Sequence, residues 1–150
     1  MTDDFKFYTE LVVRYEETDA MSVVYYGNYF IFFEVARTEY LKNIGYNYVS
    51  IEKDGFYFVV AESNCKYFSP ARYDDDLKVF AKIEYVKNSS FNFLYNIVKK
   101  GKNENENSSE QDVNIAKGNT VLVCVDNVDF RPRRIPDYLR KAIQNFEGFE

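Results

Sequence analysis

The 150-residue sequence contains no histidine and no tryptophan, and it has only two cysteines and three prolines. Without histidine, Ser-His-Asp and Cys-His catalysis are excluded, and so are histidine-ligated zinc sites. Any acid–base chemistry at neutral pH must then come from carboxylates, lysine, tyrosine or cysteine. Cys65 and Cys124 are far apart and each falls in an apolar stretch, so we expect small buried groups and no metal-binding or redox pair.

Long hydrophobic runs are also missing. No apolar stretch approaches the ~20 residues that a membrane-spanning helix needs. The N-terminus, MTDDFKFYTE, is acidic and lacks the basic start and apolar block of a signal peptide. The net charge of −5 argues against nucleic acid as the main partner. We therefore expect a cytoplasmic protein with no membrane span and no nucleic-acid partner.

What the sequence does contain is enough apolar material for one core. Hydrophobic residues make up 46% of the chain, and its length suits a single domain over residues 1–150. Aromatic residues reach 19%, all of them phenylalanine or tyrosine. Such a content indicates sheet-rich packing or an apolar binding cavity, and packing is the simpler interpretation.

The most apolar segment predicts a buried helix from about residue 26 or 27 to residue 44. Its apolar side chains recur at the three-and-four spacing of one helix face: Tyr26, Phe30, Phe33, Ala36, Tyr40 and Ile44. A second apolar row, Tyr29, Phe32 and Val35, leaves little room for water around the first two turns. A helix that is apolar on most of its circumference is normally wrapped by other elements.

Alternating apolar and polar residues predict antiparallel strands around this helix, over residues 5–13, 56–68, 77–85, 91–97 and 113–125. Gly118 is a candidate β-bulge in the last of them. Residues 101–112, GKNENENSSEQD, contain no apolar side chain and predict a long, flexible hairpin loop. Short helices are expected at 48–53 and 137–146. The pattern predicts an α+β fold, with a five-stranded antiparallel sheet beside a long central helix.

Several motifs then point to one family. They are RYEETD at 14–19, VVYYGNY at 23–29, EVAR at 34–37, YFSPARYDD at 67–75 and VCVD at 123–126. Together they resemble the hotdog-fold acyl-CoA thioesterases, nearest the 4-hydroxybenzoyl-CoA thioesterase group and its YbgC-like branch. The resemblance covers most of the chain and implies the hotdog fold, in which the sheet wraps the helix. It also implies a homodimer or homotetramer with each acyl site at a subunit interface.

The resemblance implies an enzyme that hydrolyses an acyl-CoA thioester to a free acid and CoA. Asp19 would act as general base or as nucleophile, two roles that the sequence leaves open. The backbone N–H of Tyr26, helped by Gly27, would bind the oxyanion at the helix N-terminus. Gly27 could instead serve only to allow a sharp turn into the helix, and Asp19 could be an ordinary cap or turn residue. No metal and no cofactor are expected, because coenzyme A is part of the substrate.

Coenzyme A carries phosphates and an adenine, which call for cationic, hydroxyl and N–H donors. The candidate donors are Arg72, Asn88, Ser89, Ser90, Arg131 and Arg133. For residues 88–90 an ordinary hairpin turn is the alternative, and for the arginines a solvated surface. Glu34 and Arg37, three residues apart on the helix, more simply orient the helix against a neighbouring strand than take part in catalysis.

Two departures from the family pattern bear on activity. YbgC-like members carry a histidine where this chain has Tyr26, and relatives carry glycine at one or two of the positions 20–22, here Ala-Met-Ser. A non-catalytic module that binds acyl-CoA or acyl carrier protein on the same fold is therefore the alternative function. The sequence does not determine the acyl chain, or the choice between CoA and acyl carrier protein.

Overall fold

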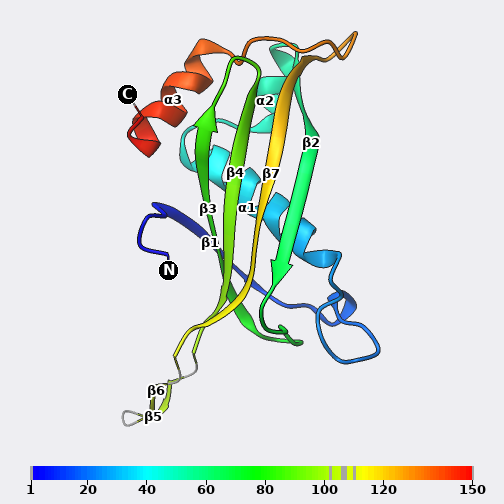
Figure 1. The fold of residues 1–150 in the computed structure, drawn as a ribbon, viewed down its shortest axis with the longest axis vertical. Helices are drawn as coiled ribbons and strands as arrows, with labels where there is room; N and C mark the ends of the chain where they lie inside the picture. Colours follow the sequence, from blue (N-terminus) through cyan, green and yellow to red (C-terminus); the bar gives the residue numbers. More distant parts are fainter. Residues whose placement is uncertain (1, 102, 106–107, 110, 150) are drawn as a thin grey trace.

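The computed structural model describes residues 2–101, 103–105, 108–109 and 111–149. Within them, one five-stranded antiparallel sheet has the order β1-β3-β4-β7-β2. Its strands are β1 (Phe7–Val12), β2 (Phe56–Tyr67), β3 (Asp76–Val86), β4 (Ser90–Lys99) and β7 (Val113–Asp126). The helices are η1 (Tyr15–Glu17), α1 (Asn28–Asn43), α2 (Tyr48–Lys53) and α3 (Asp137–Glu147). The sheet and the helix α1 across it confirm the predicted α+β hotdog fold (Figure 1).

The core lies between α1 and the facing side of the sheet. Phe33, Ala36 and Tyr40, which share one helix face, are completely buried. Two of them meet inward side chains of β4: the Phe33 ring stacks on the Tyr95 ring at 4.3 Å between centroids, and the Tyr40 ring lies edge-on to the Phe93 ring at 5.1 Å. Burial of such large apolar groups is the main force that holds the helix on the sheet.

The opposite face of α1 is open in a single chain. Tyr29 and Phe32 of the second apolar row are buried, as predicted, but Val35 is 38% exposed and its neighbour Ile31 is 50% exposed. The prediction for Val35 was wrong because the sheet covers only one side of the helix. An exposed apolar strip therefore runs along the outer side of α1.

Gly118 does not form the predicted bulge. It pairs in regular register with Cys65 of β2 and with Tyr95 of β4. The register shift in β7 lies instead at Ile115, since Ile97 pairs with Ala116 and Val98 with Asn114. Gly118 is required for a different reason: a Cβ there would lie 2.5 Å from Cε2 of Phe33, so a side chain would displace that ring.

The helices begin and end close to the residues that the sequence predicts. The helix α1 has Gly27 as its N-cap and ends before Gly45, whose φ of 98° favours glycine. The short helices at 48–53 and 137–147 agree with prediction to within one residue. No helix in the described part of the chain is long and apolar enough to cross a membrane.

The predicted loop at 101–112 is only partly described. Residues 102, 106, 107 and 110 lie outside the described residues. Two short strands, β5 (Asn103–Asn105) and β6 (Ser108–Ser109), pair antiparallel and extend the β4–β7 hairpin away from the sheet (Figure 1). The flexibility of this segment stays a prediction.

Candidate active site

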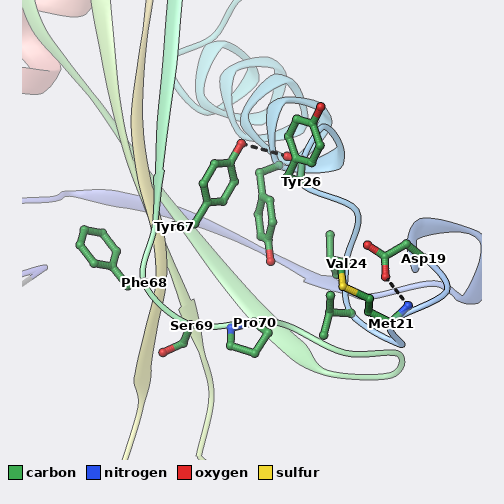
Figure 2. A pocket seen from close by; sticks show the side chains of 10 residues that line it. Asp19, Met21, Val24, Tyr26, Tyr67, Phe68, Ser69 and Pro70 are labelled. Atoms are coloured by element: carbon green, nitrogen blue, oxygen red, sulfur yellow. Dashed lines mark hydrogen bonds between the residues drawn. The ribbon is translucent and has the colours of Figure 1, made fainter.

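A groove of about 320 Å³ lies where the loop before α1 meets the end of β2. Its lining is mostly apolar and aromatic: Asp19, Met21, Val23, Val24, Tyr26, Tyr29, Tyr67, Phe68, Ser69 and Pro70. Figure 2 shows Asp19 and Met21 together at one end and Phe68 at the other. An apolar groove with few polar groups is the usual form of a small-molecule site. We call it the Asp19 pocket.

Asp19 is held by a tight turn. Its Oδ1 accepts a hydrogen bond from the Met21 N–H at 2.9 Å (Figure 2), and its own N–H donates to the Val23 carbonyl at 2.9 Å. Its Oδ2 accepts no hydrogen bond from the described residues, so one carboxylate oxygen is anchored and the other is available. Asp19 is thus a turn residue that also lines the pocket, and it is not the helix cap, because that position belongs to Gly27.

The turn contains a residue in the left-handed region. Ser22 has φ of 63°, where glycine is favoured. The carbonyl of Ser22 accepts a hydrogen bond from Arg72 Nη1 at 3.5 Å. Arg72, a predicted coenzyme A contact, therefore lies beside the Asp19 turn.

Two backbone donors are free at the start of α1. The Tyr26 and Gly27 N–H groups have no acceptor among the residues that the structure describes. Their neighbours are engaged: the Tyr25 N–H donates to Glu17 O at 2.9 Å, and the Asn28 N–H donates to Tyr25 O at 2.9 Å. Unpaired N–H groups at a helix N-terminus carry partial positive charge and bind anions readily.

Gly27 is not needed for a sharp turn into the helix. Its φ of −66° and ψ of −24° are ordinary right-handed values that any residue adopts. A Cβ there would approach Cε1 of Tyr25 to 3.1 Å, so what glycine provides is space.

Aromatic residues that the sequence analysis did not assign to the site complete the pocket. Tyr29 is buried, its hydroxyl accepts from the Ala71 N–H at 3.4 Å, and burial raises its pKa. The Tyr67 hydroxyl donates to the Tyr26 carbonyl at 3.2 Å. The signal for Tyr67 was its place at the start of the 67–75 motif, but its partner, 41 positions earlier, is not visible in the sequence.

The other predicted coenzyme A contacts lie elsewhere. Residues 88–90 form the β3–β4 turn, and Arg133 packs over the Phe56 ring at 5.1 Å, at the start of β2. The Asp19 pocket is at the end of β2. The strand has twelve residues, and the eleven steps between them, at ~3.3 Å each, separate its two ends by about 36 Å. Figure 1 shows the loop after β7 and the β3–β4 turn at the opposite end of the sheet from the loop before α1.

Several of these distant residues have structural partners. Asn88 Oδ1 accepts from Arg134 Nη1 at 3.3 Å, and the Ser89 carbonyl accepts from the Cys124 N–H at 2.7 Å. Arg133 pairs with Asp126 at 2.7 Å. Arg131 is the least engaged, because its side chain is 85% exposed and reaches Asp129 only at 4.0 Å.

Arg37 connects the helix to the sheet. Its Nη1 donates to Tyr95 Oη at 3.3 Å and to Thr120 Oγ1 at 3.5 Å, on β4 and β7. Among the described residues Glu34 forms no ion pair with it. These contacts support the structural interpretation of Arg37.

The fold and the pocket together define a hotdog domain whose apolar pocket is lined by one acidic side chain, Asp19, and by Tyr26 just before α1. The Thioesterase-like superfamily matches residues 13–143. The acyl-CoA thioester hydrolase YbgC of Escherichia coli O6:H1 is 35% identical over 124 residues, 83% of this chain and 85% of that protein. The acyl-CoA thioesterase YbgC of Haemophilus influenzae is 29% identical, over 90% of this chain and 92% of its own.

Among solved structures, DHNA-CoA thioesterase from Staphylococcus aureus superposes with a TM-score of 0.80 at 30% identity. The match covers 94% of this chain and 90% of that one. The chain therefore belongs to the Thioesterase-like superfamily.

Proposed function

We propose that this protein is an acyl-CoA thioester hydrolase in which Asp19 and the backbone at the start of α1 perform the chemistry. The observation that carries the proposal is that Asp19, a carboxylate with one free oxygen, and Tyr26, whose N–H has no acceptor among the described residues, line one apolar pocket. The unpaired N–H of Gly27 follows next in the chain. The names of the relatives support the same reaction class. The pocket leaves the acyl group undetermined, and either CoA or acyl carrier protein could carry it.

Each part of the site has a chemical task. The acyl chain occupies the apolar groove, with its thioester carbonyl oxygen at the N–H of Tyr26 or Gly27. Asp19 Oδ2 deprotonates a water that attacks the carbonyl carbon, or attacks that carbon itself. The N–H donors stabilise the negative oxygen of the tetrahedral intermediate. The intermediate then expels the CoA thiolate, which takes up a proton. If Asp19 acts as general base, this step gives the free acid directly. If Asp19 is the nucleophile, it gives an anhydride with Asp19, which water hydrolyses to release the acid and restore the carboxylate.

The test is an acyl-CoA panel scored by release of free thiol. We expect Asp19→Asn to keep the turn, since an amide oxygen also accepts the Met21 N–H, and to lower kcat by about 10²-fold or more. Asp112→Asn is the matched control, because Asp112 also accepts one backbone N–H, that of Gly101, away from the pocket. Unchanged turnover in Asp19→Asn would remove Asp19 from the mechanism. Acyl-CoA binding without thiol release by the wild type would favour the non-catalytic binding module.

We also propose that two copies pair through β2. This strand is an edge of the sheet, and Val60 on it is 55% exposed. Beside it a second groove of about 310 Å³ is lined by Phe30 and Ile31 of α1, and Ile31 belongs to the exposed strip. An antiparallel pair of β2 strands would place the Phe56 end of one chain beside the Tyr67 end of the other. Arg131 and Arg133 of one copy would then approach the Asp19 pocket of its partner.

Sedimentation velocity tests the pairing. Val60→Lys should shift the protein toward the monomer and reduce thiol release, because a charge would be buried at the proposed interface. Val12→Lys, on the other edge strand at 48% exposure, should leave the assembly unchanged. A dimer that survives Val60→Lys with full activity would contradict this arrangement.

A further inference from the structure

The hydroxyl of Tyr67 joins the last residue of β2 to the peptide that precedes α1. It donates to the Tyr26 carbonyl at 3.2 Å, as Figure 2 shows. Between the two residues lie 40 others, which include the whole of α1, α2 and most of β2. The contact therefore exists only because the sheet brings the end of β2 to the start of the helix.

The carbonyl that Tyr67 holds is part of the same rigid unit as a candidate oxyanion donor. The C=O of Tyr26 and the N–H of Gly27 belong to one planar peptide group, in which they point in opposite directions. A hydrogen bond that fixes the direction of the oxygen also fixes the direction of the N–H. It polarises the group as well, so that the N–H becomes a stronger donor.

The surroundings of Tyr67 restrain its ring. Its ring makes edge-on contacts with those of Tyr29, at 5.4 Å, and Tyr26, at 6.4 Å. Partial burial, followed by the hydrogen bond to the Cys65 side chain, raises the pKa of Tyr67 to about 12, although the residue is 46% exposed. The phenol thus stays protonated, and able to donate, throughout the neutral range.

We infer that Tyr67 is a positioning residue for the reaction: its hydroxyl orients the Tyr26–Gly27 peptide, and with it the unpaired Gly27 N–H, at the start of α1. The inference rests on the proposed function, since it assigns a role within that site. It makes Gly27, through its peptide N–H, an oxyanion donor whose direction is set from another element of the fold. No proton or bond is exchanged with Tyr67 during the reaction.

The test is Tyr67→Phe, which keeps the ring and removes only the hydroxyl. We expect kcat to fall roughly tenfold, the scale of one hydrogen bond, while KM changes by less than about twofold. If Tyr67 had only a structural role, the substitution would lower stability without lowering kcat at a nearly constant KM. We expect Tm to change by only about 1–2 °C, as for other partly exposed sites. Tyr73→Phe is the matched control, because Tyr73 is an exposed tyrosine whose ring, among the residues that the structure describes, meets no aromatic ring but that of Tyr15.

A second readout does not depend on turnover. In ¹⁵N-labelled protein the Gly27 amide resonance should shift in Tyr67→Phe and stay in place in Tyr73→Phe, because a hydrogen bond to a carbonyl changes the shielding of the amide that shares its peptide. Unchanged kcat, a change confined to KM, or an unmoved Gly27 resonance would each overturn the inference. Absence of thiol release by the wild type would instead count against the proposed function, and the resonance would still test the contact.

Discussion

The ring of Phe33 lies directly against the bare backbone of Gly118. A Cβ atom on Gly118 would come within 2.5 Å of Cε2 of Phe33 and 2.3 Å of the Asn64 carbonyl oxygen, far inside contact distance. On its other side Phe33 stacks on Tyr95, with the ring planes 8° apart. The ring is therefore fixed against β4 and β7, and its contact with Gly118 sets how closely α1 packs on the sheet.

Gly118→Ala should be strongly destabilising for this reason. Overpacking a dense core typically costs about 1–3 kcal/mol of the free energy of unfolding, and we expect the upper part of that range. Urea unfolding measures it. Phe33→Leu in the same chain should recover only part of the loss, because it removes the ring atoms that the new methyl group meets but leaves the contact with the Asn64 carbonyl oxygen. A fully stable Gly118→Ala protein would show that the ring has room to move.

The Asp19 turn offers a stabilising substitution. Ser22 has φ of 63°, which costs a residue with a Cβ about 1–2 kcal/mol, whereas glycine loses more chain entropy on folding. Ser22→Gly should therefore stabilise the protein by about 0.5–1 kcal/mol in thermal or urea unfolding. Ala20→Gly, in the same turn but without positive φ, should destabilise it instead. Equal effects of the two changes would contradict this explanation.

The arginines at the far end of β2 should affect recognition of the coenzyme A nucleotide. Replacing Arg131 and Arg133 by alanine should raise KM for acyl-CoA about three- to tenfold, and raise KM for a truncated pantetheine thioester much less. Arg131→Ala alone should account for much of the change, because Arg133 is already paired with Asp126. Lys42→Ala, an exposed lysine paired with Glu39, is the control. Equal effects on both substrates would remove these arginines from the binding site.

Both thiols should react slowly in the folded protein. Burial raises the pKa of Cys65, and raises that of Cys124 to about 11. At pH 8 the thiolate fraction is therefore low, and Cys124 in particular should react with iodoacetamide only upon unfolding. Because the folded pKa of Cys124 lies above its ordinary value of 9.0, its contribution to stability is complete below pH 9 and is lost as the pH rises toward 11.

The rate at which iodoacetamide labels each thiol can be measured separately by mass spectrometry in the single-cysteine variants Cys65→Ser and Cys124→Ser. Rapid labelling of the remaining Cys124 at pH 8 in folded protein would show that β7 opens locally.

Much of the site could be predicted because its chemistry is local in the chain. The apolar spacing of residues 26–44 and the alternation in the strands depend on near neighbours, and α1 and the five strands formed where these patterns lie. The turn that holds Asp19 Oδ1 involves only residues 19–23. The absence of histidine, which excludes whole classes of catalysis, needs no structure at all.

The remaining features required distant segments to meet. Periodicity could not show that Gly118 is needed beneath Phe33 and not at a bulge, because that depends on where α1 crosses β7. It could not place Tyr67 on the Tyr26 carbonyl, or show that Arg133 of the β7–α3 loop lies at the Phe56 end of β2 while the Asp19 pocket lies at the Tyr67 end. Residue type and local spacing determined the elements and the chemical groups available. The packing of apolar faces, which sets strand order and register, decided which of those groups share a pocket.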